Sequence, residues 1–148
     1  LGWNLSSGRE REACTRTAMQ LVDAAGFSGC AALACGVADA ALALEGLAAR
    51  QCARLTLAKV LACSAAGDGA AVLKLAPGTV PALKAANDQL MSRDFYRAWA
   101  EAAEKAGDLK TAAAAYQTLS DLIPDVSDLS KLHKRYKYKA EKLRKMVK

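Results

Sequence analysis

The residues of this chain best suited to bind a metal or to act as nucleophiles are five cysteines and one histidine. The cysteines are Cys14, Cys30, Cys35, Cys52 and Cys63. None of them forms a Cys-x-x-Cys pair, and His133 lies far beyond the last of them in the sequence. A zinc site needs four ligands at a characteristic spacing, and a catalytic cysteine needs a neighbouring base. The sequence therefore predicts no metal, no cofactor and no enzymatic activity.

The cysteines have a simpler interpretation as free thiols. All five fall in segments expected to be helical, where a thiol packs as a small hydrophobic side chain. Unpaired thiols persist in reducing compartments. The expected location is therefore intracellular: the cytoplasm, with the cilium and organelles as alternatives. His133 is expected to be an exposed residue of a basic helix, with no group that orients it.

Positive charge is the second chemical feature, and it is concentrated at the C-terminal end. Residues 129–148 contain nine lysines and arginines and one acid, Glu141, for a net charge of +8. Because the whole chain carries +6, residues 1–128 sum to −2. The basic residues predicted to bind a partner are Lys131, Lys134, Arg135, Lys137, Lys139, Lys142, Arg144 and Lys145.

Three interpretations of this basic segment remain open. It can be a solvated helix that covers the end of a repeat array. It can dock by charge complementarity on an acidic protein surface, a microtubule or a membrane. It can also neutralise the phosphates of a nucleic acid while Tyr136 or Tyr138 stacks on a base. Basic charge alone does not separate the three.

Composition predicts the elements that carry these residues. The chain contains 34 alanines against seven valines and one isoleucine. Alanine is the strongest helix former, whereas strands favour β-branched residues. The predicted fold class is therefore all-α. No stretch of about 20 residues is free of charged and turn residues, so no transmembrane segment is expected.

Capping signals predict where the first helices begin and end. A Ser-x-x-Glu capping box at residues 7–10 predicts the start of the first helix. Gly26 is expected to end that helix, because glycine accepts the left-handed conformation, and Ser28 to cap the next one. That second helix is expected to break or bend near Gly36. Further helical segments are expected at about residues 37–44 and 47–66.

A proline-containing segment predicts an interruption later in the chain. Pro77-Gly78 favours a turn, because proline removes a helical donor. Thr79 is expected to cap a new helix that has Pro81 in its first turn and continues to Leu90. The sequence therefore predicts a bend or an irregular loop here.

Similar glycine-containing turns recur along the chain. Gly26, Gly67 and Gly107 follow one another at nearly equal spacing, and each precedes a small-residue helix. A helical hairpin cannot bury its apolar face alone, so consecutive hairpins stack. The predicted architecture is an α-solenoid of antiparallel helical hairpins with a basic C-terminal helix.

The segment from Arg93 to Pro124 alternates bulky and small residues along two helical stretches joined at Gly107-Asp108. The expected seam residues are Tyr96, Trp99, Ala100, Ala103, Gly107, Ala112, Tyr116, Leu119 and Pro124. With this pattern, residues 93–126 resemble one tetratricopeptide repeat, which is a single helix–turn–helix unit. The resemblance implies two antiparallel helices with these residues in the seam.

Two domains are expected, a helical-repeat domain over residues 1–126 and a basic amphipathic helix over residues 127–148. Asp125 and Ser127 are candidate caps for this helix. The apolar stripe expected on it consists of Leu129, Leu132, Tyr136, Ala140, Leu143 and Val147.

The combination of one tetratricopeptide-like unit with looser hairpins resembles the C-terminal solenoids of coatomer and intraflagellar-transport subunits. That resemblance implies a non-catalytic scaffold or adaptor, which binds other protein subunits of a larger complex in intracellular or intraflagellar transport. The alternative is an RNA-binding helical-repeat protein of an organellar ribonucleoprotein. RNA-binding repeats usually carry lysine and arginine in every unit, whereas residues 1–128 are slightly acidic. The charge distribution therefore favours the scaffold.

Overall fold

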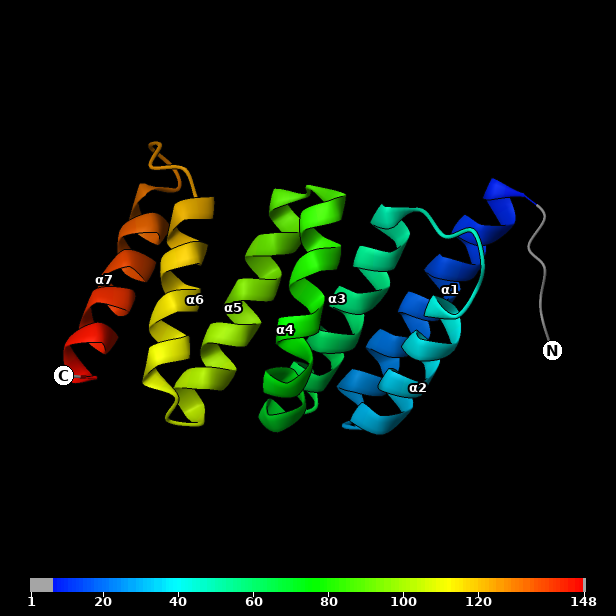
Figure 1. Cartoon of the computed structure of the whole chain (residues 1–148), viewed down its shortest axis with the longest axis horizontal. Coiled ribbons are helices and arrows are strands. Elements are labelled where there is room, and N and C mark those ends of the chain that lie inside the picture. The colour runs from blue at the N-terminus through cyan, green and yellow to red at the C-terminus, as the bar shows by residue number, and fades with distance from the viewer. Residues whose placement is uncertain (1–6, 148) are drawn as a thin grey trace. The chain divides into compact units, whose positions relative to one another are not determined.

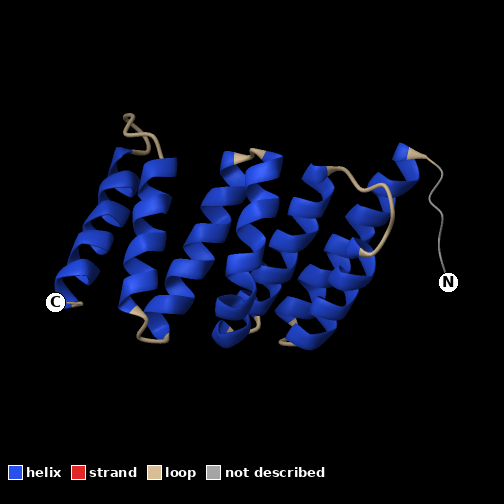
Figure 2. Ribbon diagram, in the orientation of Figure 1, coloured by secondary structure: helices blue, strands red, loops and turns tan. Residues whose placement is uncertain are grey.

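The computed structural model of the chain describes residues 7–147, which form seven α-helices and no β-strand (Figure 1, Figure 2). The helices are α1 (Gly8–Phe27), α2 (Ala31–Leu42), α3 (Ala49–Ala65), α4 (Gly69–Ala86), α5 (Gln89–Lys105), α6 (Leu109–Leu122) and α7 (Ser130–Met146). The prediction of an all-α fold is confirmed. The predicted capping box is also confirmed, because the Ser7 hydroxyl and the Glu10 carboxylate each accept a hydrogen bond from the backbone N–H of the other.

The chain divides into two compact units at Asn87–Asp88. In the first unit α1 packs against α2 and α3, α2 packs against α3, and α3 packs against α4. In the second unit α6 packs against both α5 and α7. The segment expected to form a separate C-terminal element is therefore an integral helix of the second unit.

Three successive helix ends share one kind of turn. Gly67, Asn87 and Gly107 have a left-handed backbone, with φ of 77°, 49° and 77°, and lie at equal intervals along the chain. An aspartate follows each of them and accepts a hydrogen bond from the backbone N–H three residues later, at 2.9 to 3.1 Å. The left-handed residue ends one helix, and the aspartate caps the next. These local signals fix the boundaries between α3 and α6.

Gly26 does not end the first helix, contrary to the prediction. α1 continues to Phe27, and the left-handed residue is Gly29, with φ of 76°. Gly26 is buried, and a Cβ atom built on it would lie 2.7 Å from the Cα atom of Ala62 on α3. The glycine is therefore required for the close contact between α1 and α3. The next helix begins after Cys30 without a side-chain cap, so Ser28 is not its cap.

The second helix is continuous, so the bend expected near Gly36 and the separate helix expected at 37–44 do not form. Its buried residues are alanines at three- and four-residue spacing: Ala34, Ala38 and Ala41. They pack with Val22, Ala25, Leu55, Ala58 and Ala62. The core of the first unit is thus built mainly from small side chains.

The predicted break at Pro77-Gly78 is wrong, because α4 runs through both Pro77 and Pro81. The prolines deprive the carbonyls of Leu73 and Pro77 of their helical donors, and both proline rings lie on the exposed side. The opposite face, with Val72, Ala76, Thr79 and Leu83, is buried. Packing of this face offsets the cost of the missing hydrogen bonds.

Thr79 is consequently not a helix cap. It lies inside α4 with 1% of its surface exposed, and its hydroxyl donates a hydrogen bond to the Leu75 carbonyl at 3.0 Å. A threonine in a helix interior satisfies its hydroxyl in this way when no water can reach it.

The second unit has a core of aromatic and small residues between α5 and α6. Of the expected seam positions, Ala100, Ala103, Ala112, Tyr116 and Leu119 are buried, Tyr96 and Trp99 are half-buried, and Gly107 and Pro124 are exposed. The largest buried residue of α5 is Phe95, which the sequence pattern did not single out. Its ring lies 5.0 Å from that of Tyr96 and 5.5 Å from that of Trp99, measured between centroids.

Replacing Gly26 by alanine is expected to destabilise the protein, because the new methyl group would overlap Ala62. Overpacking of this kind costs roughly 1–3 kcal/mol. The matched control is Gly36→Ala in α2, where a Cβ would meet nothing within 4 Å. There, alanine is expected to stabilise the helix by roughly 0.5–1 kcal/mol. Urea unfolding measures both changes, and equal effects of the two substitutions would contradict the close contact.

Replacing Ala112 by leucine is expected to lower the free energy of unfolding by roughly 1–3 kcal/mol, because this alanine is fully buried. The control is Ala114→Leu on the exposed side of the same helix, where the change is expected to stay within about 0.5 kcal/mol. Thermal or urea unfolding of the two variants tests the orientation of α6. Comparable stability of both variants would show that Ala112 does not face the seam.

Candidate interaction surface

The basic helix α7 is oriented by the face that it turns toward α6. Ala140 and Leu143 are buried on this face, and the Tyr136 ring stacks on the Tyr116 ring with centroids 5.8 Å apart. Leu132 and Val147, expected in the same stripe, are instead 37% and 50% exposed. The residues of α7 that contact α6 are therefore His133, Tyr136, Ala140 and Leu143. His133 occupies the position on this face that was expected for Leu132.

His133 binds backbone carbonyls at the end of α6, a role that the sequence did not suggest. Its Nδ1 atom lies 2.9 Å from the carbonyl oxygens of both Ser120 and Ile123. The Arg93 Nε–H donates to the Leu122 carbonyl, also at 2.9 Å. The last carbonyls of a helix have no partner within the helix. Here neighbouring helices supply the donors, so His133 is oriented after all.

The start of α7 is also held by a side-chain contact. The predicted caps are not used as caps, since α7 begins after Leu129 without a side-chain cap. Asp125 instead interacts with the Ser130 side chain, and this hydrogen bond lowers the pKa of the Asp125 carboxyl.

One predicted partner-binding residue, Lys139, is engaged within the second unit. Its Nζ atom donates to a Glu104 carboxylate oxygen at 2.9 Å and to the Tyr116 hydroxyl oxygen at 3.0 Å. The Tyr116 hydroxyl donates to the same carboxylate at 2.7 Å. The three residues come from α5, α6 and α7, so this cluster joins all three helices of the unit.

The environment shifts the pKa values in this cluster. Hydrogen bonds from Tyr116 and Lys139 lower the pKa of Glu104 below its ordinary value of 4.5. Burial raises the pKa of Tyr116 to about 12. The carboxylate is therefore ionised and the phenol protonated at neutral pH, which is the arrangement that their mutual hydrogen bond requires.

The other seven predicted basic residues are exposed. They are Lys131, Lys134, Arg135, Lys137, Lys142, Arg144 and Lys145. Tyr138 is 67% exposed and lies on the side of α7 opposite Ala140. Five basic residues lie three, four or seven positions from Tyr138, which places them on the same helical face. They are Lys131, Lys134, Arg135, Lys142 and Lys145. We call Tyr138 and these five residues the outer face of α7.

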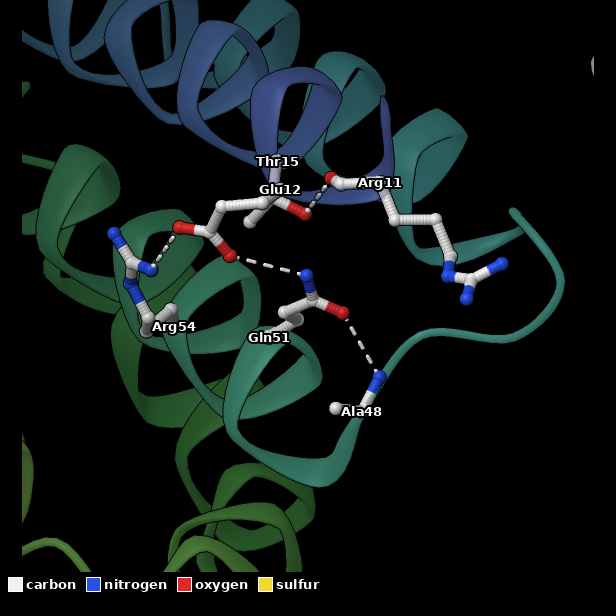
Figure 3. Close-up of polar contacts among 6 residues, drawn as sticks. All are labelled: Arg11, Glu12, Thr15, Ala48, Gln51 and Arg54. Carbon is white, nitrogen blue, oxygen red and sulfur yellow. Dashed lines mark hydrogen bonds and ion pairs between the residues drawn. The ribbon is translucent and has the colours of Figure 1, made fainter. Parts of the chain in front are cut away.

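A polar cluster in the first unit joins α1 to α3 (Figure 3). The Glu12 carboxylate accepts hydrogen bonds from Gln51 at 3.1 Å and from Arg54 at 3.0 Å. These two bonds lower the pKa of Glu12. The Gln51 side chain also accepts a hydrogen bond from the Ala48 backbone N–H, and Arg11 faces the loop that contains Gly46. A cavity of about 340 Å³ lies among these residues. The cluster fixes the start of α3 against α1.

The structure also shows the state of the cysteines and the character of the helices with respect to a membrane. All five cysteines are free; Cys63 is buried, Cys30 is exposed, and the other three are partly buried. Across residues 7–147, no group of three or more histidine, cysteine or acidic side chains is arranged to hold a metal ion. Of the helices described, none combines the length and the apolar character needed to cross a membrane.

Comparison with known proteins found no relative of this chain. No family model, no curated protein and no solved structure matches the chain. Function is therefore inferred from the surfaces of the two units.

Replacing Glu104 by glutamine is expected to destabilise the second unit in a pH-dependent way. Because its folded-state pKa is lowered, the carboxylate contributes stability above pH 4.5, and this contribution is lost as the pH falls below that value. The expected loss is about 1 kcal/mol at neutral pH, since Glu104 and Lys139 are each 36% exposed and solvent screens the pair.

Glu101→Gln is the control, because Glu101 is exposed on the same helix. Unfolding free energies of both variants and the parent protein, measured at neutral pH and below pH 4.5, make the comparison. The difference between Glu104→Gln and the parent should shrink at the lower pH. A pH-independent difference would show that the Glu104 charge contributes nothing.

Proposed function

We propose that the chain is a non-catalytic scaffold or adaptor subunit of a multi-subunit assembly, and that α7 docks on an acidic surface of a neighbouring protein. The observation that carries this proposal is the outer face of α7. Five cations surround Tyr138 there, whereas the buried apolar residues of the helix, Ala140 and Leu143, face α6. Complementary charge brings such a surface to its partner and fixes how the two meet.

The internal contacts of α7 explain why the charge is available to a partner. Within residues 7–147, Lys139 is the only one of the predicted basic residues that forms an ion pair with an acidic side chain. Contact with α6 uses His133, Tyr136, Ala140 and Leu143, and this contact leaves the outer face to solvent. The helix is therefore anchored by one side and charged on the other, as expected of a docking element.

We also propose that the helices pair as antiparallel hairpins of an α-solenoid, with residues 93–126 as a tetratricopeptide-like unit. The regular recurrence of the left-handed turn at Gly67, Asn87 and Gly107 supports a repeat in which helices end at equal intervals. Stacked hairpins present extended surfaces for other subunits. The proposed setting is a reducing intracellular compartment, the cytoplasm or the cilium, with a role in intracellular or intraflagellar transport.

RNA binding is the second candidate, and Tyr138 is the observation that favours it. An exposed aromatic ring among cations can stack on a base while the cations bind phosphates, and stacking contributes roughly 1–3 kcal/mol per base. The same residue is compatible with a protein interface, where tyrosine is enriched. Affinity measurements must therefore separate the two functions.

The test removes charge from the outer face without unfolding the unit. The variant carries Lys131→Gln, Arg135→Gln and Lys145→Gln, and the control carries Lys74→Gln, Lys84→Gln and Lys110→Gln, all at exposed positions. Both lose three charges. Deletion of α7 is unsuitable, because it would remove the contacts of Tyr136, Ala140 and Leu143 with α6. Circular dichroism checks that both variants remain folded.

Two binding assays then distinguish the functions. In affinity capture followed by mass spectrometry, a protein partner is expected to be retained by the parent and the control but lost with the outer-face variant or at high salt. In fluorescence anisotropy, a single-stranded oligouridine is expected to bind weakly and without dependence on Tyr138. Tight oligouridine binding that Tyr138→Ala weakens by about 1–3 kcal/mol, with no protein partner captured, would overturn the scaffold function.

A further inference from the structure

Two thiols from different helices of the first unit lie side by side. The Sγ atoms of Cys35 on α2 and Cys63 on α3 are 3.5 Å apart, although the residues are separated by 28 positions in sequence. At this distance one thiol donates an S–H hydrogen bond to the other sulfur. A disulfide bond requires an S–S distance of about 2.0 Å. The two sulfurs are thus in contact but not bonded.

An ion pair joins the same two helices beside the sulfurs. Lys59, four residues before Cys63, forms an ion pair with Asp39, four residues after Cys35, at 2.6 Å. Residues four apart lie on the same face of a helix. The ion pair therefore lies one turn away from the thiols along both helices and links α2 to α3 there.

The two thiols differ in accessibility, which gives them different chemical roles. Cys63 is fully buried, whereas Cys35 is partly exposed. Burial, and then the hydrogen bond with Cys35, raises the pKa of the Cys63 thiol to about 12. Cys35 is therefore the thiol that a dissolved oxidant meets first, and Cys63 is the neighbour that can react with the product.

We propose that Cys35 and Cys63 form an oxidation site, at which a peroxide converts the thiol pair into an intrachain disulfide that ties α2 to α3. In the first step the Cys35 sulfur attacks hydrogen peroxide, the O–O bond breaks, and Cys35 becomes a sulfenic acid with release of water. In the second step the Cys63 sulfur loses its proton and attacks the Cys35 sulfur, the S–O bond breaks, and the hydroxyl group leaves with that proton as a second water. Two thiols are oxidised by two electrons, and one peroxide is reduced to two waters.

The crosslink would act on the shortest helix of the first unit. α2 is 12 residues long, and its buried side chains are alanines. Local opening is easiest where few apolar contacts hold a segment. A bond between Cys35 and Cys63 closes a loop that contains most of α2 and its connection to α3, and a crosslink of this kind also restricts the unfolded chain. Oxidation is therefore expected to hold α2 in place and to stabilise the first unit.

The experiment uses the full chain with Cys30→Ser, because Cys30 is exposed and lies on the same tryptic peptide as Cys35. The protein is treated with hydrogen peroxide, remaining thiols are alkylated, and trypsin is added. Residues 17–50 then carry only Cys35, and residues 60–74 carry only Cys63. The expected product is these two peptides joined, lighter than their sum by two hydrogen atoms and separated again by dithiothreitol, while Cys14 and Cys52 are alkylated.

Two matched variants and a second readout make the result specific. Adding Cys35→Ser is expected to abolish the joined peptides, whereas adding Cys52→Ser is expected to leave them unchanged. Amide hydrogen exchange in α2 is expected to slow at least several-fold after oxidation, and only in proteins that retain both Cys35 and Cys63. Oxidation of Cys35 to the sulfinic acid without a crosslink, or a crosslink that excludes Cys63, would overturn the proposal. An unchanged exchange rate in the crosslinked protein would overturn the stabilising role of the bond.

Discussion

Close contact between helices with small side chains is the constraint on which the first unit depends. Gly26 meets Ala62 where α1 crosses α3, and α2 contributes buried alanines alone. Small residues bury little apolar surface each, so their contribution depends on helices that approach closely and leave no voids. The polar contacts between these helices therefore matter more for holding the unit together. Glu12 with Gln51 and Arg54 joins α1 to α3, and Asp39 with Lys59 joins α2 to α3.

The second unit is held together by contacts of a different kind. It has large buried aromatic residues, Phe95 and Tyr116, and a polar cluster in which Lys139 and Glu104 contact the Tyr116 hydroxyl. Side chains from α5 and α7 also donate to the last carbonyls of α6. These contacts determine which side of α7 faces inward. The position of the outer face, and with it the proposed docking function, is therefore a consequence of internal packing.

The two proposals concern different units and different chemistry. The outer face of α7 in the second unit is a charged surface suited to an acidic partner. The thiol pair of the first unit is suited to oxidation, and its effect is expected within α2 and α3. A reducing compartment is compatible with both, because the pair remains as thiols until an oxidant reaches Cys35.

The sequence by itself determined the features that arise within a few residues of chain. Alanine content decides the all-α class, and Ser7 with Glu10 specifies the first helix start. Glycine followed by aspartate specifies the turns at 67 and 107, because the left-handed backbone and the cap are local effects. The basic character of residues 129–148 can likewise be read by counting charges.

Tertiary structure alone decided the features that depend on a neighbouring helix. Pro77 and Pro81 remain in a helix because the opposite face of α4 is buried, which local propensity does not include. Gly26 is a contact point and not a helix end, because Ala62 lies against it. The same reason applies to His133, Lys139 and the Cys35–Cys63 pair, whose partners are 10 to 35 residues away in the sequence. Residue type showed what chemistry each side chain can do, and helix packing decided which partner it meets.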